Sequence, residues 1–428
     1  MNARAFEPIL SANWTVPNGH TLDVYRQRGG YEAFKKSLSM DYDTILNEVK
    51  TSNLRGRGGA GFPTGIKWSF LPKESDVPKY LAINADEGEP GTFKDRYIME
   101  LDPHRLLEGC LITGWALNLR ATYIYIRGEM LEGAQRLDAA IDELYAAGLL
   151  GKNILGKGYD HDIYVHRGAG AYICGEETAM IESLEGKAGQ PRLKPPFPAV
   201  VGVFSCPTVV NNVETIACIP TIIERGGQWF ADAGSERNGG PKLIQISGWV
   251  NNPGTYEAPS GLSLRDFIFS DQFGGGLREG AKVKAVIPGG SSCPPLTADE
   301  LDVGMDFDQM QAAGTMFGTG GVIVIPDHVC LVRMAARTAH FYYHESCGQC
   351  TPCREGTGWV ARLLDQIEAG EGKMSDLELL LEICDNVEGN TICPLGDAMA
   401  MPIRGYLKKF EGEFARHIEE RACPYPAW

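Results

Sequence analysis

Four cysteines have the spacing of an iron–sulfur site. Cys347, Cys350 and Cys353 are separated by two residues each, and Cys393, followed by Pro394, lies forty residues beyond Cys353. Two-residue gaps let successive thiolates converge on one centre, and a cysteine followed by proline also ends the cluster-binding run of bacterial ferredoxins. A structural zinc ion is the alternative, but zinc sites more often use two separate cysteine pairs. The spacing therefore favours an iron–sulfur cluster.

The fourth ligand of such a cluster has two candidates, Cys384 and Cys393. Cys384 follows Leu380, Leu381 and Ile383 in an apolar helical pattern, which is typical of a packing residue. Cys393 lies in a polar loop, where a thiolate can turn toward a cluster, so we predict that it completes the site. The other cysteines are interpreted as structural: Cys110, Cys174, Cys206, Cys218, Cys293, Cys330 and Cys423.

A glycine-rich loop at residues 56–61 matches the pattern G-x-G-x-x-G. A Rossmann fingerprint should follow a strand, whereas this loop follows a predicted helix, so a standard dinucleotide fold is not indicated. Glycines still let backbone N–H groups approach an anion, and Arg57 and Lys67 add positive charge suited to phosphates. Three nearby aromatic side chains are suited to stacking on a flat ring: Phe62, Trp68 and Phe70. The alternative is an ordinary glycine turn over a core.

A second glycine-rich loop, residues 168–178, follows a predicted strand and opens a helix. The N-terminus of that helix could hold a phosphate. The simpler interpretation is that Glu176 and Glu177 only complement the helix dipole.

Two further polar segments are suited to binding a nucleotide. Residues 84–92 follow a buried strand and carry three carboxylates, at the kind of strand end where open α/β sheets bind ligands. These acids either form a solvated turn or hydrogen-bond a ribose and a flavin, and acids near a ribose favour NAD over NADP. Residues 211–215 supply amides that suit a heterocycle edge, or a helix cap.

The sequence has no clear nucleophilic triad, and its eight histidines are scattered along the chain. With an iron–sulfur motif present, chemistry that converts a hydride into single electrons is the coherent interpretation. Flavin is the cofactor that does this, while the protein supplies placement and electrostatics.

Composition excludes several classes of protein. A net charge of −15 argues against nucleic-acid binding, which needs a basic surface. The best apolar stretch, residues 321–332, is too short for a membrane helix and contains Pro326, Asp327 and His328. The first residues resemble neither a signal peptide nor a transit peptide. We therefore expect a bacterial cytoplasmic protein, or a processed organellar chain, that meets a membrane only through a partner.

Hydrophobic patterns divide the 428 residues into three parts. The first part begins with an N-terminal arm and a helix. Predicted strands then alternate with predicted helices: the strands are at 80–83, 123–126 and 163–165, and the helices are at 106–119 and 130–148. This alternation predicts a parallel or mixed sheet in an α/β domain. A polar linker at 235–241 ends this domain. Strands at 242–247 and 321–325 flank a short helix at 264–269 in a small α+β module. Beyond residue 327, four amphipathic stretches predict a helical bundle.

Six motifs, in this order, resemble the FMN-bearing NADH dehydrogenase subunit of bacterial respiratory complex I. They are GRGGAGFPTGIKW (56–68), NADEGEPGT (84–92), GAGAYICGEET (168–178), KPPFP (194–198), NNVET (211–215) and SCGQCTPCR (346–354). The resemblance implies an N-terminal arm with a Rossmann-like α/β domain for FMN and NADH (1–240), a β-grasp, ubiquitin-like module of the soluble-ligand-binding type (241–326) and a four-helix bundle with a [4Fe–4S] cluster (327–428).

The resemblance also implies individual residue roles, with no departure from the family pattern at these positions. The implied FMN contacts are Gly56, Arg57, Gly59, Lys67, Asn84, Asp86, Glu87, Gly175, Glu176, Asn211, Asn212 and Thr215. The implied NADH contacts are Phe62, Phe70 and Phe197 around the adenine, Lys194 near a phosphate, and Glu89 and Glu177 as the catalytic pair near the nicotinamide and ribose. The implied cluster ligands are Cys347, Cys350, Cys353 and Cys393.

The implied reaction is hydride transfer from NADH to FMN, followed by single-electron transfer to the cluster and onward to quinone. The implied partners are a thioredoxin-like [2Fe–2S] subunit and a large iron–sulfur subunit, at the cytoplasmic face of the inner membrane. The alternative is the diaphorase subunit of an NAD-linked hydrogenase or formate dehydrogenase. Such chains often carry extra iron–sulfur domains, so the short arm before the glycine loop and the lack of a further C-x₂-C-x₂-C favour complex I. A zinc-stabilised nucleotide-binding scaffold is the alternative from a different class.

Overall fold

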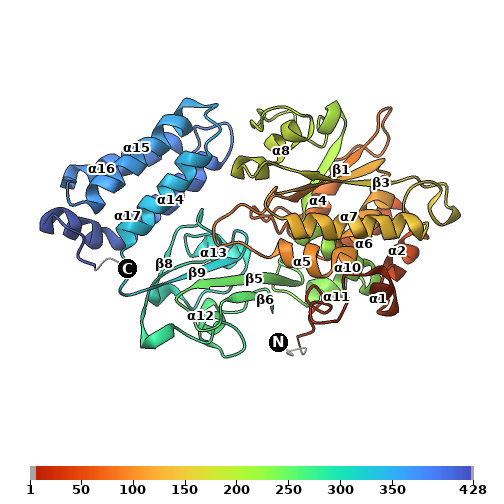
Figure 1. The fold of residues 1–428 in the computed structure, drawn as a ribbon, viewed down its shortest axis with the longest axis horizontal. Helices are drawn as coiled ribbons and strands as arrows, with labels where there is room; N and C mark the ends of the chain where they lie inside the picture. The colour runs from red at the N-terminus through yellow and green to blue at the C-terminus, as the bar shows by residue number, and fades with distance from the viewer. Residues whose placement is uncertain (1–5, 426–428) are drawn as a thin grey trace.

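The N-terminal part of the chain is built on a parallel sheet. A computed structural model describes residues 6–425, and Figure 1 shows its arrangement. Strands β1 (Tyr80–Ala85), β2 (Ala121–Ile126), β3 (Asp162–Arg167) and β4 (Thr208–Asn212) lie in the order β3-β2-β1-β4, and every neighbouring pair is parallel. The carboxyl ends of all these strands therefore meet at one edge.

Two long helices connect the first three strands, α6 (Pro103–Leu117) and α7 (Leu131–Ala146). Helix α6 is apolar on nearly all sides and almost entirely buried, as expected of a helix inside a core. The other helices of this part are α1 (Leu22–Gln27), α2 (Glu32–Ser37), α3 (Tyr42–Thr51), α4 (Thr64–Ser69), α5 (Asp95–Leu101), α8 (Glu177–Leu184), α9 (Val213–Ala217), α10 (Ile219–Arg225) and α11 (Gly227–Asp232).

The alternation predicted from the sequence is confirmed for β1, β2, β3, α6 and α7. Strand β4 was not predicted, because Val209 and Val210 are its only apolar residues and two asparagines end it. So short a run has no readable period. It matters here because β4 lies directly beside β1 and brings Asn211 and Asn212 to the edge of the sheet.

The middle part contains a mixed sheet with the order β6-β5-β9-β7-β8. Its elements are β5 (Pro241–Gly248), β6 (Gly254–Pro259), α12 (Leu264–Phe269), β7 (Val283–Ile287), β8 (Leu296–Thr297), α13 (Phe307–Ala312) and β9 (Gly321–Pro326). The predicted strands at 242–247 and 321–325 and the helix at 264–269 are confirmed, and the two strands pair in parallel.

The C-terminal part is helical, and it lies at one end of the molecule in Figure 1. Its helices are α14 (Leu331–Glu345), α15 (Thr351–Glu368), α16 (Met374–Val387) and α17 (Leu395–Glu420). Helix α14 packs on α15 and α17, and α16 packs on the same two helices. Each predicted amphipathic stretch lies in one of these helices. No helix within residues 6–425 is long and apolar enough to cross a membrane.

A buried group of charges joins the α/β part to the middle part. Glu214 accepts a hydrogen bond from the backbone N–H of Leu243 (3.0 Å), and its carboxylate lies 2.9 Å from Lys94 Nζ and 3.6 Å from Lys242 Nζ. Burial raises the pKa of Glu214, but Lys242, Lys94 and Arg57 outweigh it and lower the pKa to about 2. The carboxylate therefore stays charged and holds β5 against α9. Sequence analysis did not predict that these charges pair, because residues so far apart give no local signal.

Candidate functional site

Four loops meet at the carboxyl edge of the parallel sheet. Asn84 and Asn212 are paired in register on β1 and β4. Asn84 Nδ2 donates to the carbonyl of Gly175, at 2.7 Å, and so ties the second glycine loop to β1. In the first glycine loop, the backbone N–H of Arg57 donates to Thr215 Oγ1 at 2.8 Å. The structure thus brings the predicted flavin residues together from all four motifs.

The first glycine loop is closed on itself and packed against β4. Gly56 N donates to the carbonyl of Phe62 at 2.8 Å, and Trp68 Nε1 donates to Asn211 Oδ1 at 2.9 Å. A Cβ atom at Gly58 would lie 3.2 Å from Asn212 Cβ, and Gly59 has φ +121°. Glycine is therefore required at residue 59 by its backbone conformation.

The side chain of Arg57 has a different role from the one expected. Its guanidinium is buried, and Nη2 donates to the carbonyls of Gly239 (2.7 Å) and Pro241 (3.1 Å). These contacts fix the glycine loop to the start of β5. The expectation that this charge faces a phosphate is not supported by the geometry, although the loop backbone can still contact a ligand.

Asp86 carries an unsatisfied buried atom at the point where the loops meet. Within residues 6–425, its Oδ2 has no hydrogen-bond partner, and burial raises the pKa of this carboxyl to about 7. A Cβ at Gly175 would lie 3.4 Å from the Asp86 carbonyl oxygen and 3.7 Å from Oδ2, so Gly175 is directly beside the unpaired atom. Buried polar atoms are usually paired. An unpaired acid beside a glycine cradle fits a missing polar ligand such as a flavin.

Several predicted flavin residues also cap helices. Glu176 accepts from the backbone N–H groups of Thr178 (2.8 Å) and Ala179 (3.0 Å), and Asn212 accepts from Glu214 N at 3.0 Å. Glu87 accepts from the N–H groups at the start of α5. Burial, then the charge of Asp95, raises the pKa of Glu87 to about 7. The side chain of Asn212 thus forms the helix cap that was the alternative for residues 211–215, and the side chain of Glu176 caps α8. Capping leaves the backbone of both residues free to contact a ligand.

A network of charges lies across the loop edge. Lys67 Nζ is 3.1 Å from Glu177, and Lys194 Nζ is 3.0 Å from Glu177 and 2.9 Å from Glu176. Burial raises the pKa of Glu177, but Lys67 and Lys194 outweigh it and lower the pKa below its ordinary value. Two lysines and two carboxylates thus hold one another in place at the site.

Exposed aromatic side chains lie in the same motifs. Phe62, Phe70 and Phe197 are 46%, 57% and 57% exposed, and the ring centroids of Phe62 and Phe70 are 6.0 Å apart. Rings of this size are usually buried. Their exposure fits stacking against a flat ligand.

Glu89 lies where the three parts of the chain meet. Its carboxylate accepts from Tyr172 Oη at 2.6 Å and from Ser292 N at 2.8 Å, and Tyr342 Oη lies 3.4 Å away. Tyr172 belongs to the second glycine loop, Ser292 to the middle part and Tyr342 to α14. Sequence analysis did not single out these three partners, since no motif contains more than one of them.

The four predicted cluster ligands line one small pocket. Cys350 and Cys353 lie at the start of α15, Cys347 lies just before it and Cys393 lies between α16 and α17. Ile173 and Pro191 of the α/β part complete its wall. The pocket has the donor set of a [4Fe–4S] cluster. Burial raises the pKa of Cys353 to about 11 and that of Cys393 to about 12, so a bound metal must displace their protons.

Cys384 is fully buried on α16 and is not part of this pocket. The geometry therefore favours Cys393 over Cys384 as the fourth ligand.

A separate open cavity lies at the ends of β1 and β2. Glu87, Thr92, Arg96 and Arg127 are among the residues that line it. Glu87 is the only predicted flavin residue among those that line it. This cavity is therefore distinct from the candidate flavin site, where the four loops meet.

The fold and the site define a flavoprotein with an iron–sulfur centre, and comparisons with known proteins agree. Three family models match: the Nuo51 FMN-binding domain at residues 49–221, the SLBB domain at 242–324 and the NADH-ubiquinone oxidoreductase-F iron-sulfur binding region at 333–417. The first range includes every predicted FMN residue, and the third includes the four predicted cluster cysteines.

Known relatives cover almost the whole chain. It is 56% identical to an F subunit (F 2) of the NADH-quinone oxidoreductase of Rhizobium meliloti, over 98% of this chain and 100% of the relative. It is 51% identical to the NADH-quinone oxidoreductase F subunit of Streptomyces coelicolor, over 98% and 92%. A solved structure, an NAD+-reducing [NiFe]-hydrogenase in the H2-reduced state, is 34% identical, with a TM-score of 0.84 over 99% of this chain and 68% of that chain. The chain belongs to the family of NADH-quinone oxidoreductase F subunits, whose cofactors are FMN and a [4Fe–4S] cluster.

Proposed function

We propose that this chain is the NADH-oxidising flavoprotein subunit of a quinone-reducing respiratory complex, complex I. Family membership and the match of both cofactor-binding regions support this function. The observation that carries it is the wall of the cysteine pocket, where Ile173 of the second glycine loop lies beside the predicted cluster ligands. Ile173 is only two residues from Gly175, so electrons leaving the flavin loops have a short path to the cluster.

When bound, FMN takes a hydride from NADH, and the [4Fe–4S] cluster carries single electrons away. The chain's own residues bind and orient. Backbone groups of the glycine loops would cradle the FMN phosphate, and Asp86 would supply a polar partner to the flavin. Lys67 balances the charge at this edge of the site.

For NADH, the exposed rings of Phe62, Phe70 and Phe197 stack around the adenine, and Lys194 faces a phosphate. Glu177 and Glu89 lie beside the ribose and nicotinamide. The contacts of Glu89 with Ser292 of the middle part and Tyr342 of the helical part make it a residue that holds the three parts of the chain in register around the substrate.

The finer description of the fold belongs to this proposal. We assign residues 1–240 to the arm and the Rossmann-like domain, 241–326 to a β-grasp module and 327–428 to a four-helix bundle. The mixed sheet with short helices, α12 and α13, between its strands supports the β-grasp assignment. The mutual packing of α14, α15, α16 and α17 supports the bundle.

The partners proposed are a thioredoxin-like [2Fe–2S] subunit and a large iron–sulfur subunit, with the complex attached to the cytoplasmic face of the bacterial inner membrane. The likeness to an NAD+-reducing hydrogenase supports iron–sulfur partners in general. It also supports the second candidate function, the diaphorase subunit of such a hydrogenase.

The test is the activity of the anaerobically purified protein with its partner subunits. We expect noncovalent FMN, reduction of ferricyanide by NADH, and reduction of quinone by NADH in the whole complex. FAD in place of FMN, or the absence of flavin and iron–sulfur absorbance, would overturn the assignment. Hydrogen-dependent NAD reduction without quinone reduction would favour the hydrogenase alternative.

A further inference from the structure

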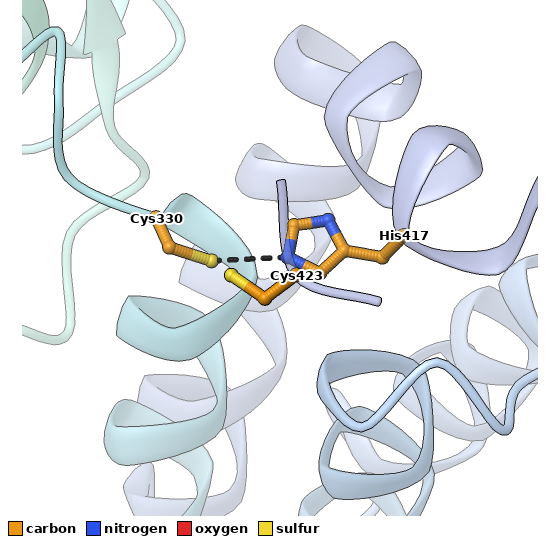
Figure 2. A group of neighbouring side chains, drawn as sticks. All are labelled: Cys330, His417 and Cys423. Carbon is orange, nitrogen blue, oxygen red and sulfur yellow. Dashed lines mark hydrogen bonds between the residues drawn. The ribbon is translucent and has the colours of Figure 1, made fainter. Parts of the chain in front are cut away.

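A second group of metal-ligating side chains lies at the far end of the helical part, separate from the cysteine pocket. Cys330, His417 and Cys423 place one ligand atom each within 4.8 Å of the other two. Figure 2 shows the two sulfur atoms and His417 Nε2 pointing toward one another. Sequence analysis interpreted both cysteines as structural, because 87 and 93 residues separate Cys330 from the other two.

The ligand atoms already have a geometry close to that of a metal site. Cys330 Sγ lies 3.2 Å from His417 Nε2. In a tetrahedral zinc site, metal–sulfur and metal–nitrogen bonds of about 2.3 and 2.0 Å put such atoms about 3.5 Å apart. Only a small adjustment is needed to admit the ion.

The histidine is held in the tautomer that a metal requires. His417 Nδ1 lies 2.7 Å from the carbonyl oxygen of Glu413, one turn earlier on α17. A carbonyl can only accept, so Nδ1 carries the proton and Nε2 presents a lone pair to the sulfur atoms. Metal-binding histidines are oriented in this way by a carbonyl or carboxylate behind the ring.

The first cysteine is fixed at the start of a helix. Cys330 is the N-cap of α14, and its sulfur accepts from the backbone N–H of Arg333 at 3.3 Å. Burial raises the pKa of the Cys330 thiol to about 12, although the hydrogen bond from Arg333 N opposes the shift, so a bound ion must displace the proton. Two thiolates also neutralise the charge of a divalent ion, which suits a site where Cys330 and His417 are almost fully buried.

Surrounding contacts hold both cysteine-bearing segments in place. The carboxylate of Glu413 accepts from Leu331 N (2.6 Å), Lys284 Nζ (3.1 Å) and Tyr425 Oη (3.0 Å). Leu331 follows Cys330, and Tyr425 lies two residues after Cys423. A Cβ at Gly370 would lie 2.2 Å from the Arg421 backbone, so the turn that leads to Cys423 is packed closely against the loop between α15 and α16.

We propose that Cys330, His417 and Cys423 bind one zinc ion, with water as the fourth ligand beside the half-buried Cys423. Binding displaces one proton from each thiol, so two protons leave as the ion enters. The ion clamps the start of α14 to the end of α17. Soft sulfur with imidazole selects zinc over magnesium or calcium. This site does not depend on the function proposed above.

The test is the metal content and coordination of the purified complex. We expect about one zinc ion per chain in addition to iron, with zinc X-ray absorption showing two sulfur neighbours at about 2.3 Å and nitrogen or oxygen neighbours at about 2.0 Å. Cys423→Ser should lose most of the zinc and keep flavin and iron. Cys206→Ser, which changes another half-buried cysteine, is the matched control and should keep the zinc.

Three results would overturn the proposal. Wild-type protein could lack zinc and fail to take up added Zn²⁺ under reducing conditions. The zinc could have four sulfur neighbours, which would place it among the cluster cysteines. Mass spectrometry could show a Cys330–Cys423 disulfide in freshly isolated protein. If Cys423→Ser does not fold, a chelator can be used to remove zinc from the wild-type protein. Zinc removal should lower the melting temperature, and Zn²⁺ but not Mg²⁺ should restore it. An unchanged melting temperature would contradict the proposed clamp.

Discussion

Replacing Glu177 by glutamine tests how the site distinguishes NADH from NADPH. The carboxylates of Glu176 and Glu177 balance Lys67 and Lys194 in one network, so the four charges cancel. The substitution leaves this edge of the site with one net positive charge. A 2′-phosphate on the ribose, which the intact network does not attract, should then bind more favourably.

The size of the effect follows from the partial burial of Glu177, whose side chain is 23% exposed. At an effective dielectric of about 20–40, a unit charge about 6 Å from a phosphate contributes about 1–3 kcal/mol. This corresponds to about a 10- to 100-fold rise in the NADPH/NADH ratio of kcat/KM. The assay is ferricyanide reduction with each nucleotide at matched ionic strength.

Glu185→Gln is the matched control, because Glu185 lies at the opposite end of α8 from Glu177 and is also ion-paired, with Arg192. It lies about 12 Å further along the helix, beyond one screening length. We expect its nucleotide ratio to equal that of the wild type. If Glu177→Gln changes the ratio no more than Glu185→Gln does, charge is not the discriminator and the selection must be steric.

Three further predictions concern the cluster and the buried charges. Cys393→Ser should abolish the cluster's EPR signal and quinone reduction, while flavin content and ferricyanide reduction persist. Cys384→Ser should cost about 1–3 kcal/mol of stability and keep the EPR signal. The reverse pattern would make Cys384 the ligand. Glu214→Gln should lower the free energy of unfolding in urea by about 3–5 kcal/mol, because Lys242 loses its buried partner. A decrease of less than about 1 kcal/mol, as for a surface ion pair, would contradict this prediction. Asp86→Asn should stabilise flavin-free protein more at pH 8 than at pH 5. The folded-state pKa of Asp86 is about 7, above its ordinary value, so the wild type loses up to about 4 kcal/mol of stability as the pH rises toward 7 and Asp86 ionises. A gain in stability that does not depend on pH would exclude ionised Asp86 as the cause.

The local patterns of the sequence were enough to identify the main elements and the chemistry. Strands β1, β2 and β3 and helices α6 and α7 have clear apolar periods, and their alternation predicts a parallel sheet. The two-residue gaps between Cys347, Cys350 and Cys353 indicate a metal-binding site within a segment of seven residues. Such signals survive in the sequence because the interactions behind them are local.

Contacts between distant residues were decided only by the tertiary structure. The guanidinium of Arg57 donates to carbonyls more than 180 residues away, and Glu214 meets Lys94 and Lys242 across two parts of the chain. The same is true of Cys330, His417 and Cys423, each ordinary in its own segment. Charges and ligands of this kind act through space, so their partners are set by how the helices and sheets pack and not by spacing along the chain.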